Sequence, residues 1–332
     1  MGKIGEPMKK NIQVFISIPF CIEHPRWGKD TAFADSTHEL RMAYLDALER
    51  ELVAAVPQLA EYHVADVEVG GGVPSMMSPD RLGKIVRDFK ENVDMDPRGQ
   101  VEIRMMPQTV CTPSLSGLGT GGFTRASLVM DSAVDSELEY LGAGYTIEKV
   151  QYAVVFLDKF GWRDVNLDLM YGIPGQTSAS WTTTLHAARD FQPTHVTLRP
   201  FSEMADANAL AAVKAAAGEP EAVLDPELEA QLLQQACEFL PTVGLDPCAR
   251  GCFARGGFES AYVLNRAHGM EYLGFGLGAR SYVDGMTYQN TTDLQLYLEH
   301  SDSFQQMATN VVELTQQQVD EYERVCASLL VV

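Results

Sequence analysis

The sequence lacks the features that mark membrane-spanning, secreted and nucleic-acid-binding proteins. It contains no uninterrupted apolar run of about 18 residues, the length that a helix needs to cross a bilayer. The segment from Met1 to Lys10 is polar, and no apolar core of a signal peptide follows it. Basic side chains are scarce, and the formal net charge of -20 disfavours nucleic acids and anionic membranes, because both attract clustered cations. The sequence therefore predicts a cytoplasmic protein.

Cysteine is also scarce. In a chain without a predicted signal peptide, six cysteines among 332 residues are better interpreted as thiols or ligands than as a disulfide framework. Apolar residues are plentiful: 46% of the chain is hydrophobic and 21% is charged. This balance predicts one large α/β domain, or a domain with an appendage. The cysteines are Cys21, Cys111, Cys237, Cys248, Cys252 and Cys326.

Apolar runs typical of strands alternate with amphipathic helical runs from residue 12 to residue 198. Strands are predicted over 12–18, 64–69, 101–105, 124–130, 164–169 and 194–198. Helices are predicted over 38–56, 79–89, 147–160 and 178–189, with a short one near Pro113. This alternation predicts a parallel sheet that is covered by helices.

The pattern changes after Phe201. Residues 209–224 are rich in Ala, Gly and Glu and are interpreted as a surface excursion or as a helix that frays into a linker. Beyond them the sequence predicts a helix over 226–240, a loop from Cys248 to Cys252, a Gly-rich segment over 272–279 and a last helix over 315–330. No internal repeat with a fixed period is present.

Six short motifs follow one another in order: Ile18-Pro-Phe-Cys21, Gly70-Gly-Gly-Val-Pro-Ser75, Arg125-Ala-Ser-Leu128, Val165-Asn-Leu-Asp-Leu-Met-Tyr-Gly-Ile-Pro-Gly-Gln-Thr177, His195-Val-Thr-Leu198 and Tyr272-Leu-Gly-Phe-Gly-Leu-Gly-Ala279. Together they resemble the radical SAM enzymes of the oxygen-independent coproporphyrinogen III oxidase family, which includes heme chaperones. The resemblance implies an α/β fold with a partial (β/α)6 TIM-like barrel over 12–205. It also implies a tail over 1–11 and a C-terminal α/β extension over 206–332 that is shorter than in the family.

The resemblance further implies a 4Fe-4S cluster held by a C-x-x-x-C-x-x-C loop after the first strand, with S-adenosylmethionine chelating the open iron. On this sequence the three cysteine positions hold Cys21, Pro25 and Gly28. Neither proline nor glycine has a side chain that binds iron. The chain is therefore interpreted as a degenerate member that lacks two of the three cluster cysteines.

Two of the family's contacts to S-adenosylmethionine are also changed. Where the family has an acidic residue that helps to bind the methionine end, the aligned stretch begins with Arg104, which reverses the charge. Where the family has a glutamine, this chain has Asp131. If the strand register is as predicted, Arg104, Asp131 and Arg199 point toward one barrel mouth. They would line a pocket for an acidic ligand there or pair with one another.

Other parts of the family's binding site are retained. Gly70, Gly71 and Gly72 let a backbone approach a ligand closely, although the turn itself also requires glycine. Asp168 stands near a strand end that opens into a barrel mouth, where it either contacts a ligand or caps the following turn. These four residues, with Arg104 and Asp131, are the candidate cofactor-binding residues.

Metal-binding alternatives come from the remaining donors. Cys248 and Cys252 form a C-x-x-x-C pair that, with Cys21, would rebuild a three-thiolate site from distant segments. His24 beside Cys21 and His195 on the last barrel strand are candidate ligands for a metal or a heme. Cys21 also fits a buried packing thiol, and each histidine also fits a hydrogen-bonded structural residue.

Three hypotheses about function remain open. In the first, the chain is a non-radical pseudoenzyme that acts as a partner or regulatory subunit, for example of an active paralogue, or that binds a tetrapyrrole such as heme or a porphyrin. In the second, it is an active tetrapyrrole-related enzyme with an atypical cluster or altered chemistry in the barrel. In the third, it binds S-adenosylmethionine or another small molecule without radical chemistry. The loss of two cluster ligands favours the first hypothesis.

Overall fold

The computed structural model describes residues 9–22, 36–204 and 225–330. Its strands are β1 (Lys10–Ile18), β2 (Tyr62–Gly71), β3 (Val101–Met105), β4 (Arg125–Asp131), β5 (Asp164–Tyr171), β6 (His195–Pro200), β7 (Asp246–Ala249), β8 (Cys252–Ala254), β9 (Tyr272–Phe275), β10 (Arg280–Val283), β11 (Met286–Asn290) and β12 (Ala308–Glu313). Its α-helices are α1 (His38–Leu59), α2 (Pro79–Asn92), α3 (Thr112–Gly119), α4 (Asp135–Leu141), α5 (Ile147–Lys159), α6 (Ser178–Asp190), α7 (Phe201–Met204), α9 (Pro226–Phe239), α10 (Ala261–Ala267), α11 (Leu294–His300), α12 (Phe304–Met307) and α13 (Gln316–Ser328). Short 3-10 helices cover Pro74–Met76, Pro107–Thr109 and Leu240–Val243.

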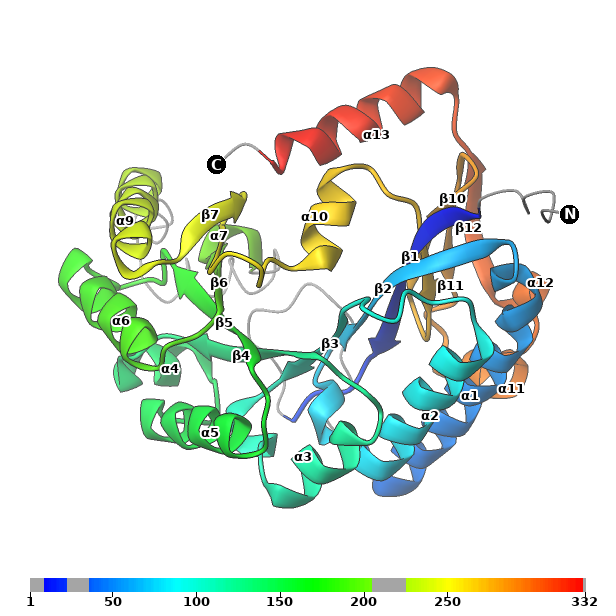
Figure 1. The fold of residues 1–332 in the computed structure, drawn as a ribbon, viewed down its shortest axis with the longest axis horizontal. Coiled ribbons are helices and arrows are strands. Elements are labelled where there is room, and N and C mark those ends of the chain that lie inside the picture. The colour runs from blue at the N-terminus through cyan, green and yellow to red at the C-terminus, as the bar shows by residue number, and fades with distance from the viewer. Residues whose placement is uncertain (1–8, 23–35, 205–224, 331–332) are drawn as a thin grey trace, which may run out of the picture.

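The described strands form one sheet in the order β12-β11-β10-β9-β1-β2-β3-β4-β5-β6-β8-β7. Strands β1 to β6 run parallel to one another, β9 runs parallel to β1, and β8 runs antiparallel to β6. Figure 1 shows the sheet as an open arc that is not closed into a barrel. The predicted α/β fold with a partial barrel is confirmed, and all six predicted strands are present.

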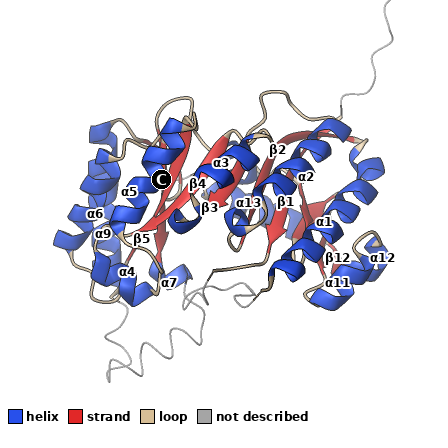
Figure 2. Ribbon diagram, turned by 90° about the horizontal axis from the view of Figure 1, so that it is seen from below, coloured by secondary structure: helices blue, strands red, loops and turns tan. Residues whose placement is uncertain are grey.

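The two faces of the arc differ in chemistry because side chains alternate along each strand. On β5, Leu167 and Leu169 are fully buried in the apolar core. Figures 1 and 2 show α1, α2, α3 and α5 along the outer side of the strands, where such a core requires cover. The alternate residues Asn166 and Asp168 are hydrogen-bonded to polar side chains of the neighbouring strands or of β5 itself. The inner face of the arc is therefore polar.

The N-terminal ends of the barrel strands are closed by the segment 255–268, which includes α10. From this segment, Asn265 Nδ2 donates to Asp66 Oδ2 (2.7 Å), and the carbonyls of Tyr262 and Phe258 accept from Gln13 and Arg125. Helix α13 contacts α10. We call this region the closed end of the arc and the region of the opposite strand termini the open end.

The predictions for the C-terminal part need correction. The segment from Cys248 to Cys252 is not a loop, because β7 and β8 pair antiparallel as a hairpin with Arg250 and Gly251 at its turn. The predicted domain boundary between 205 and 206 lies outside the described residues, and strands from both sides of it join the same sheet. None of the described helices has the length and apolar content that a membrane crossing requires.

Candidate functional site

The open end of the arc brings together side chains from several strands. There, Asp168 on β5 contacts both Arg104 near the end of β3 and Arg199 on β6. Burial raises the pKa of the Asp131 carboxyl at the end of β4 to about 6, and the charge of Arg104 opposes this shift. The side chains that the sequence predicted at one mouth are therefore neighbours, as expected for the C-terminal ends of parallel strands.

At the centre of the open end, two guanidinium groups share one carboxylate. Asp168 Oδ2 lies 3.5 Å from Arg104 Nη2 and 3.3 Å from Arg199 Nη2. Hydrogen bonds between such ions are commonly about 2.7–2.9 Å long, so these contacts are loose. The Asp168 side chain is 1% exposed, whereas those of Arg104 and Arg199 are 27% and 34% exposed. Both cations therefore remain accessible from the open end.

The pKa of Asp168 reflects the two neighbouring arginines. Burial by itself would raise the pKa of Asp168, but Arg199 and Arg104 outweigh that effect and hold this pKa below its ordinary value. Asn166 Nδ2 also donates to Asp168 Oδ1 (2.9 Å) and fixes the carboxylate from the side of β5. Arg199 Nε is buried and has no hydrogen-bond partner among the described residues. Among the residues that the structure describes, two cations thus form ion pairs with one fixed anion, and Arg199 Nε is left without a partner.

Acidic side chains line the rest of this region. Asp131 has a positive φ of 54° and accepts a hydrogen bond from Tyr145 Oη (2.8 Å). On β2, burial raises the pKa of the Glu68 carboxyl, and the nearby Glu102 carboxyl raises it further. Arg104 and Arg199 oppose both shifts. Glu68 and Tyr145 were not among the predicted site residues.

The glycine run at the end of β2 has a structural reason. The Gly72 amide donates to the Ile18 carbonyl (2.7 Å), and a Cβ at Gly72 would lie only 2.3 Å from the Phe20 carbonyl oxygen. Gly71 has a φ of +90°, which side chains other than glycine rarely adopt. These glycines hold the end of β1, and with it Cys21, against the end of β2. This geometry supports the turn interpretation and leaves the ligand role of Gly70, Gly71 and Gly72 a proposal.

Cys21 is a buried thiol at the open end. Burial raises its pKa to about 11, an effect that the nearby Arg104 only partly offsets. The thiol is therefore protonated at neutral pH, whereas iron–sulfur clusters bind thiolates. The next cysteine along the sequence is Cys111, which is exposed at the start of α3. The candidate ligand His24 lies outside the described residues, as do Pro25 and Gly28.

Cys248 lies in a different part of the molecule from Cys21, beside His195. Its Sγ is 3.8 Å from His195 Nε2, and His195 Nδ1 is 2.7 Å from Asn166 Oδ1. Burial raises the pKa of Cys248 to about 11 and that of Cys252 to about 12, and it lowers the pKa of His195 to about 3. All three groups are neutral at pH 7. Asn166, which the sequence interpretation did not assign a role, joins this group to Asp168.

The predicted three-thiolate site is not formed. Within residues 9–22, 36–204 and 225–330, no group of three His, Cys, Asp or Glu side chains is arranged to hold a metal ion. Cys248 and Cys252 belong to the β7–β8 hairpin beyond β6, whereas Cys21 follows β1 beside β2. Strands β2 to β6 separate these positions in the sheet, which is the physical reason why the three thiols do not meet.

Known proteins resemble this chain over most of its length. A scan against models of protein families found no match. The heme chaperone HemW of Haemophilus influenzae is 23% identical over 277 residues, which cover 82% of this chain and 70% of that protein. The oxygen-independent coproporphyrinogen III oxidase of Escherichia coli is 24% identical over 307 residues, covering 89% of this chain and 66% of the oxidase. The solved structure of the E. coli radical SAM enzyme HemN superposes with a TM-score of 0.82 at 21% identity, covering 97% of this chain and 76% of that one.

The chain is a relative of the oxygen-independent coproporphyrinogen III oxidases and heme chaperones. The resemblance predicted from the six motifs is confirmed, and the fold is that of a radical SAM enzyme. The matched region spans 66% of the oxidase's length. The activity and ligands of these relatives therefore enter below as proposals.

The cofactor set of this family does not fit the residues of this chain. A 4Fe-4S cluster requires several thiolates, but the loop after β1 has Cys21 alone. A cation, Arg104, stands where the resemblance places the acid that helps to bind the methionine end of S-adenosylmethionine. We therefore derive no chemical step through either cofactor.

Proposed function

We propose that this chain is a non-radical relative of the heme chaperones and coproporphyrinogen oxidases, and that it binds a tetrapyrrole through its carboxylate groups at the open end of the arc. One observation carries the proposal: Arg104 and Arg199 share a single carboxylate over distances of 3.5 and 3.3 Å, with donors left over. A propionate side chain of a tetrapyrrole would supply the second anion. Guanidinium groups suit this task because their planar donors match a carboxylate.

The charge of the whole protein supports this assignment. A chain with a formal net charge of -20 repels anions at long range, so binding an anionic ligand requires a local arrangement of cations. The partly exposed side chains of Arg104 and Arg199 provide one at the mouth of a fold whose relatives are a heme chaperone and a coproporphyrinogen oxidase by name. Both names refer to tetrapyrroles with carboxylate side chains.

The change from an acid to Arg104 separates this proposal from S-adenosylmethionine binding. Arg104 would repel the methionine ammonium group, which lies next to the carboxylate in that ligand. A tetrapyrrole carries carboxylates without an adjacent ammonium group. We therefore expect coproporphyrin III or heme to bind more tightly than S-adenosylmethionine.

The proposal is tested by titrating the full chain with coproporphyrin III and following the Soret absorbance. We expect saturable binding, with a Kd that rises about tenfold or more in Arg104→Met and in Arg199→Met, since hydrogen bonds to charged groups contribute about 1.5–3 kcal/mol. Arg98→Met is the matched control, because the Arg98 side chain is 94% exposed and lies on another part of the surface. The tetramethyl ester of coproporphyrin, which lacks the carboxylates, should bind weakly to every variant.

Three results would contradict the proposal. The first is the absence of saturable binding of coproporphyrin III and heme, which would favour a protein partner. The second is equal affinity for the acid and its ester, which would remove the role of the carboxylates. The third is tighter binding of S-adenosylmethionine than of either tetrapyrrole, which would support the small-molecule alternative.

A further inference from the structure

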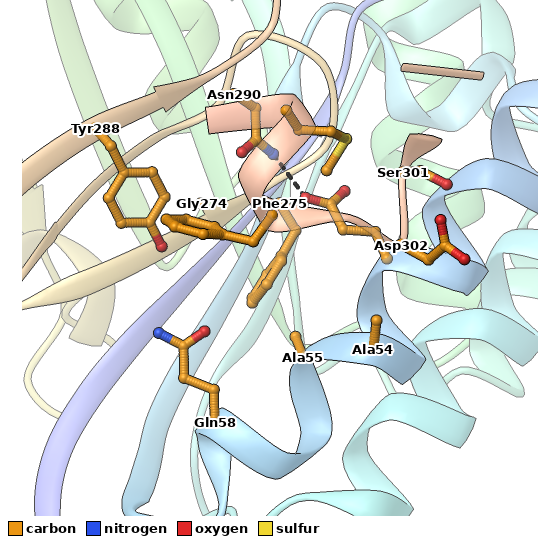
Figure 3. A pocket seen from close by; sticks show the side chains of 12 residues that line it. Ala54, Ala55, Gln58, Gly274, Phe275, Tyr288, Asn290, Ser301 and Asp302 are labelled. Carbon is orange, nitrogen blue, oxygen red and sulfur yellow. Dashed lines mark hydrogen bonds between the residues drawn. The ribbon is translucent and has the colours of Figure 1, made fainter. Parts of the chain in front are cut away.

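A cavity lies away from the open end, between α1, the strands β9 and β11, and the segment from Ser301 to Met307 that includes α12. Its volume is about 80 Å³, which is room for a small molecule or for several waters. Figure 3 shows Ala54, Ala55 and Gln58 of α1 on one side, with Phe275, Tyr288 and Asn290 opposite them and Ser301 and Asp302 beside them. It shares no lining residue with the Arg104–Asp168–Arg199 cluster.

A buried carboxyl group forms the floor of this cavity. Glu51 is 6% exposed and accepts hydrogen bonds from the Gly276 amide (2.7 Å), Tyr297 Oη (2.7 Å) and Asn290 Nδ2 (2.6 Å). These donors come from segments more than 200 residues away in the sequence, at separations of 225, 246 and 239. The carboxyl is thus held in a fixed position, although burial raises its pKa to about 7. A cation that arrived beside Glu51 would replace this proton.

Ser301 is a second buried polar group at the cavity, and unlike Glu51 it has no hydrogen-bond partner among the described residues. Ser301 is 1% exposed. A buried hydroxyl without a partner costs free energy, so a donor or acceptor from a bound molecule would satisfy it. Ser301 and Glu51 both line the cavity.

The composition of the lining selects the charge of the occupant. It contains two carboxyl groups, Glu51 and Asp302, and no Lys, Arg or His. The aromatic rings of Phe275, Tyr288 and Phe304 and the side chain of Met307 provide apolar and cation-attracting surface. A bare metal ion does not fit, because none of the described regions provides three His, Cys, Asp or Glu ligands together.

We propose that this cavity binds a small organic ammonium ion, whose NH3⁺ group hydrogen-bonds to Glu51 and Ser301 and whose alkyl part lies against Phe275 and Met307. The proposal is independent of tetrapyrrole binding at the open end. The size of the cavity restricts the ligand to a short alkyl chain, because drug-sized ligands occupy pockets of about 300 Å³ or more.

The test compares butylammonium with butan-1-ol, a neutral molecule of similar size, by calorimetric titration of the full chain. It is run at about pH 8, where a carboxyl with a pKa of about 7 is mostly ionised. We expect saturable binding of butylammonium, and binding of the alcohol at least tenfold weaker. Ala55→Leu, which fills the cavity from α1 without touching the hydrogen bonds of Glu51, should abolish binding, and Glu51→Gln should weaken it at least tenfold. Arg98→Met, at an exposed position outside the cavity lining, should leave it unchanged.

The thermal unfolding midpoint of each variant, measured without ligand, shows whether it is folded. If Glu51→Gln does not fold, Ala55→Leu and the comparison of the two ligands still decide the question. No saturable binding would mean that the cavity holds water only and would overturn the proposal. Equal binding of alcohol and ammonium would show that the positive charge is not recognised, and it would also overturn the proposal. Unchanged binding by folded Ala55→Leu would place the ammonium elsewhere and would overturn it equally.

Discussion

The two ends of the arc use the same residue types for different purposes. At the closed end, Arg125 is 1% exposed and bonds to Glu102 Oε2 at 2.9 Å and to Asp164 Oδ1 at 2.6 Å. There, one cation serves two anions at short distances, and the Phe258 carbonyl accepts a further hydrogen bond from it (3.1 Å). At the open end, two cations serve one anion at 3.3 and 3.5 Å. Arg125, whose guanidinium group is bonded to two carboxylates and a carbonyl, stabilises the fold. Arg104 and Arg199, which share one carboxylate, are available for a ligand.

The largest effect on stability is expected from the replacement of Arg125. Arg125→Met leaves Glu102 and Asp164 buried without their counter-ion, so the free energy of unfolding should fall by about 3–5 kcal/mol. Urea unfolding followed by circular dichroism measures this change. A loss below about 1 kcal/mol would show that the ion pairs of Arg125 at the closed end contribute no more to stability than those at the open end.

Arg104→Met is the matched substitution at the open end. Asp168 keeps its contact with Arg199, and the Arg104 side chain is already 27% exposed. We therefore expect a loss of about 1 kcal/mol or less, as for ion pairs that water reaches. A loss as large as that of Arg125→Met would remove the distinction between the two ends.

A further prediction concerns the pH dependence of stability that arises from Asp66 at the closed end. Burial raises the pKa of Asp66 from 3.8 to about 6, although hydrogen bonds from Asn265 and Gln13 oppose the shift. The folded state therefore binds this proton more tightly than the unfolded state, and the group contributes stability as the pH falls through about 6. Between about pH 7.5 and about pH 4.5, the wild type should gain about 2 kcal/mol relative to Asp66→Asn.

Urea unfolding of both proteins across this pH range measures the difference. The comparison uses the change with pH, because Asp66→Asn also loses a hydrogen-bond acceptor at every pH. Parallel pH profiles of the wild type and the variant would show that Asp66 titrates in the folded state as it does in the unfolded chain.

A moderate effect is expected at Tyr145, which supports the open end. Tyr145→Phe removes the 2.8 Å hydrogen bond to Asp131 and leaves that carboxyl with one donor fewer, at a cost of about 1.5 kcal/mol. Tyr152→Phe on α5 is the control, because Tyr152 is 55% exposed, and this change should cost almost nothing. Equal unfolding midpoints for the two variants would contradict the assigned role of Tyr145.

The six parallel strands were predictable because their signal is local. Each carries an apolar run that packs under helices, as on β1 and β5. Strands β7 to β12 were missed because they are short and depend on pairing. β8 spans only Cys252–Ala254 and becomes a strand through its bonds with β6 and β7. A run of three residues has no periodicity to detect.

The residues of the open end were predictable because the C-terminal ends of parallel strands lie at the same edge of a sheet. This rule places Arg104, Asp168 and Arg199 together, and they are together. It does not reach Glu51, whose role depends on Asn290, a residue 239 positions away. The one available signal was an acid at helical spacing from Leu45, Leu48 and Leu52 in an apolar stripe, since a buried acid requires partners. Tyr145 lies between α4 and α5 and has no strand-end position from which to infer its role.

Anaerobic reconstitution with iron and sulfide tests most directly whether the open end has exchanged a cluster for a pair of cations. Iron is counted per chain, and the charge-transfer absorbance is recorded, for the wild type and for Cys21→Ala. A loop with a single cysteine predicts substoichiometric iron that is the same in both proteins. About four irons per chain in the wild type, lost in Cys21→Ala, would contradict the account.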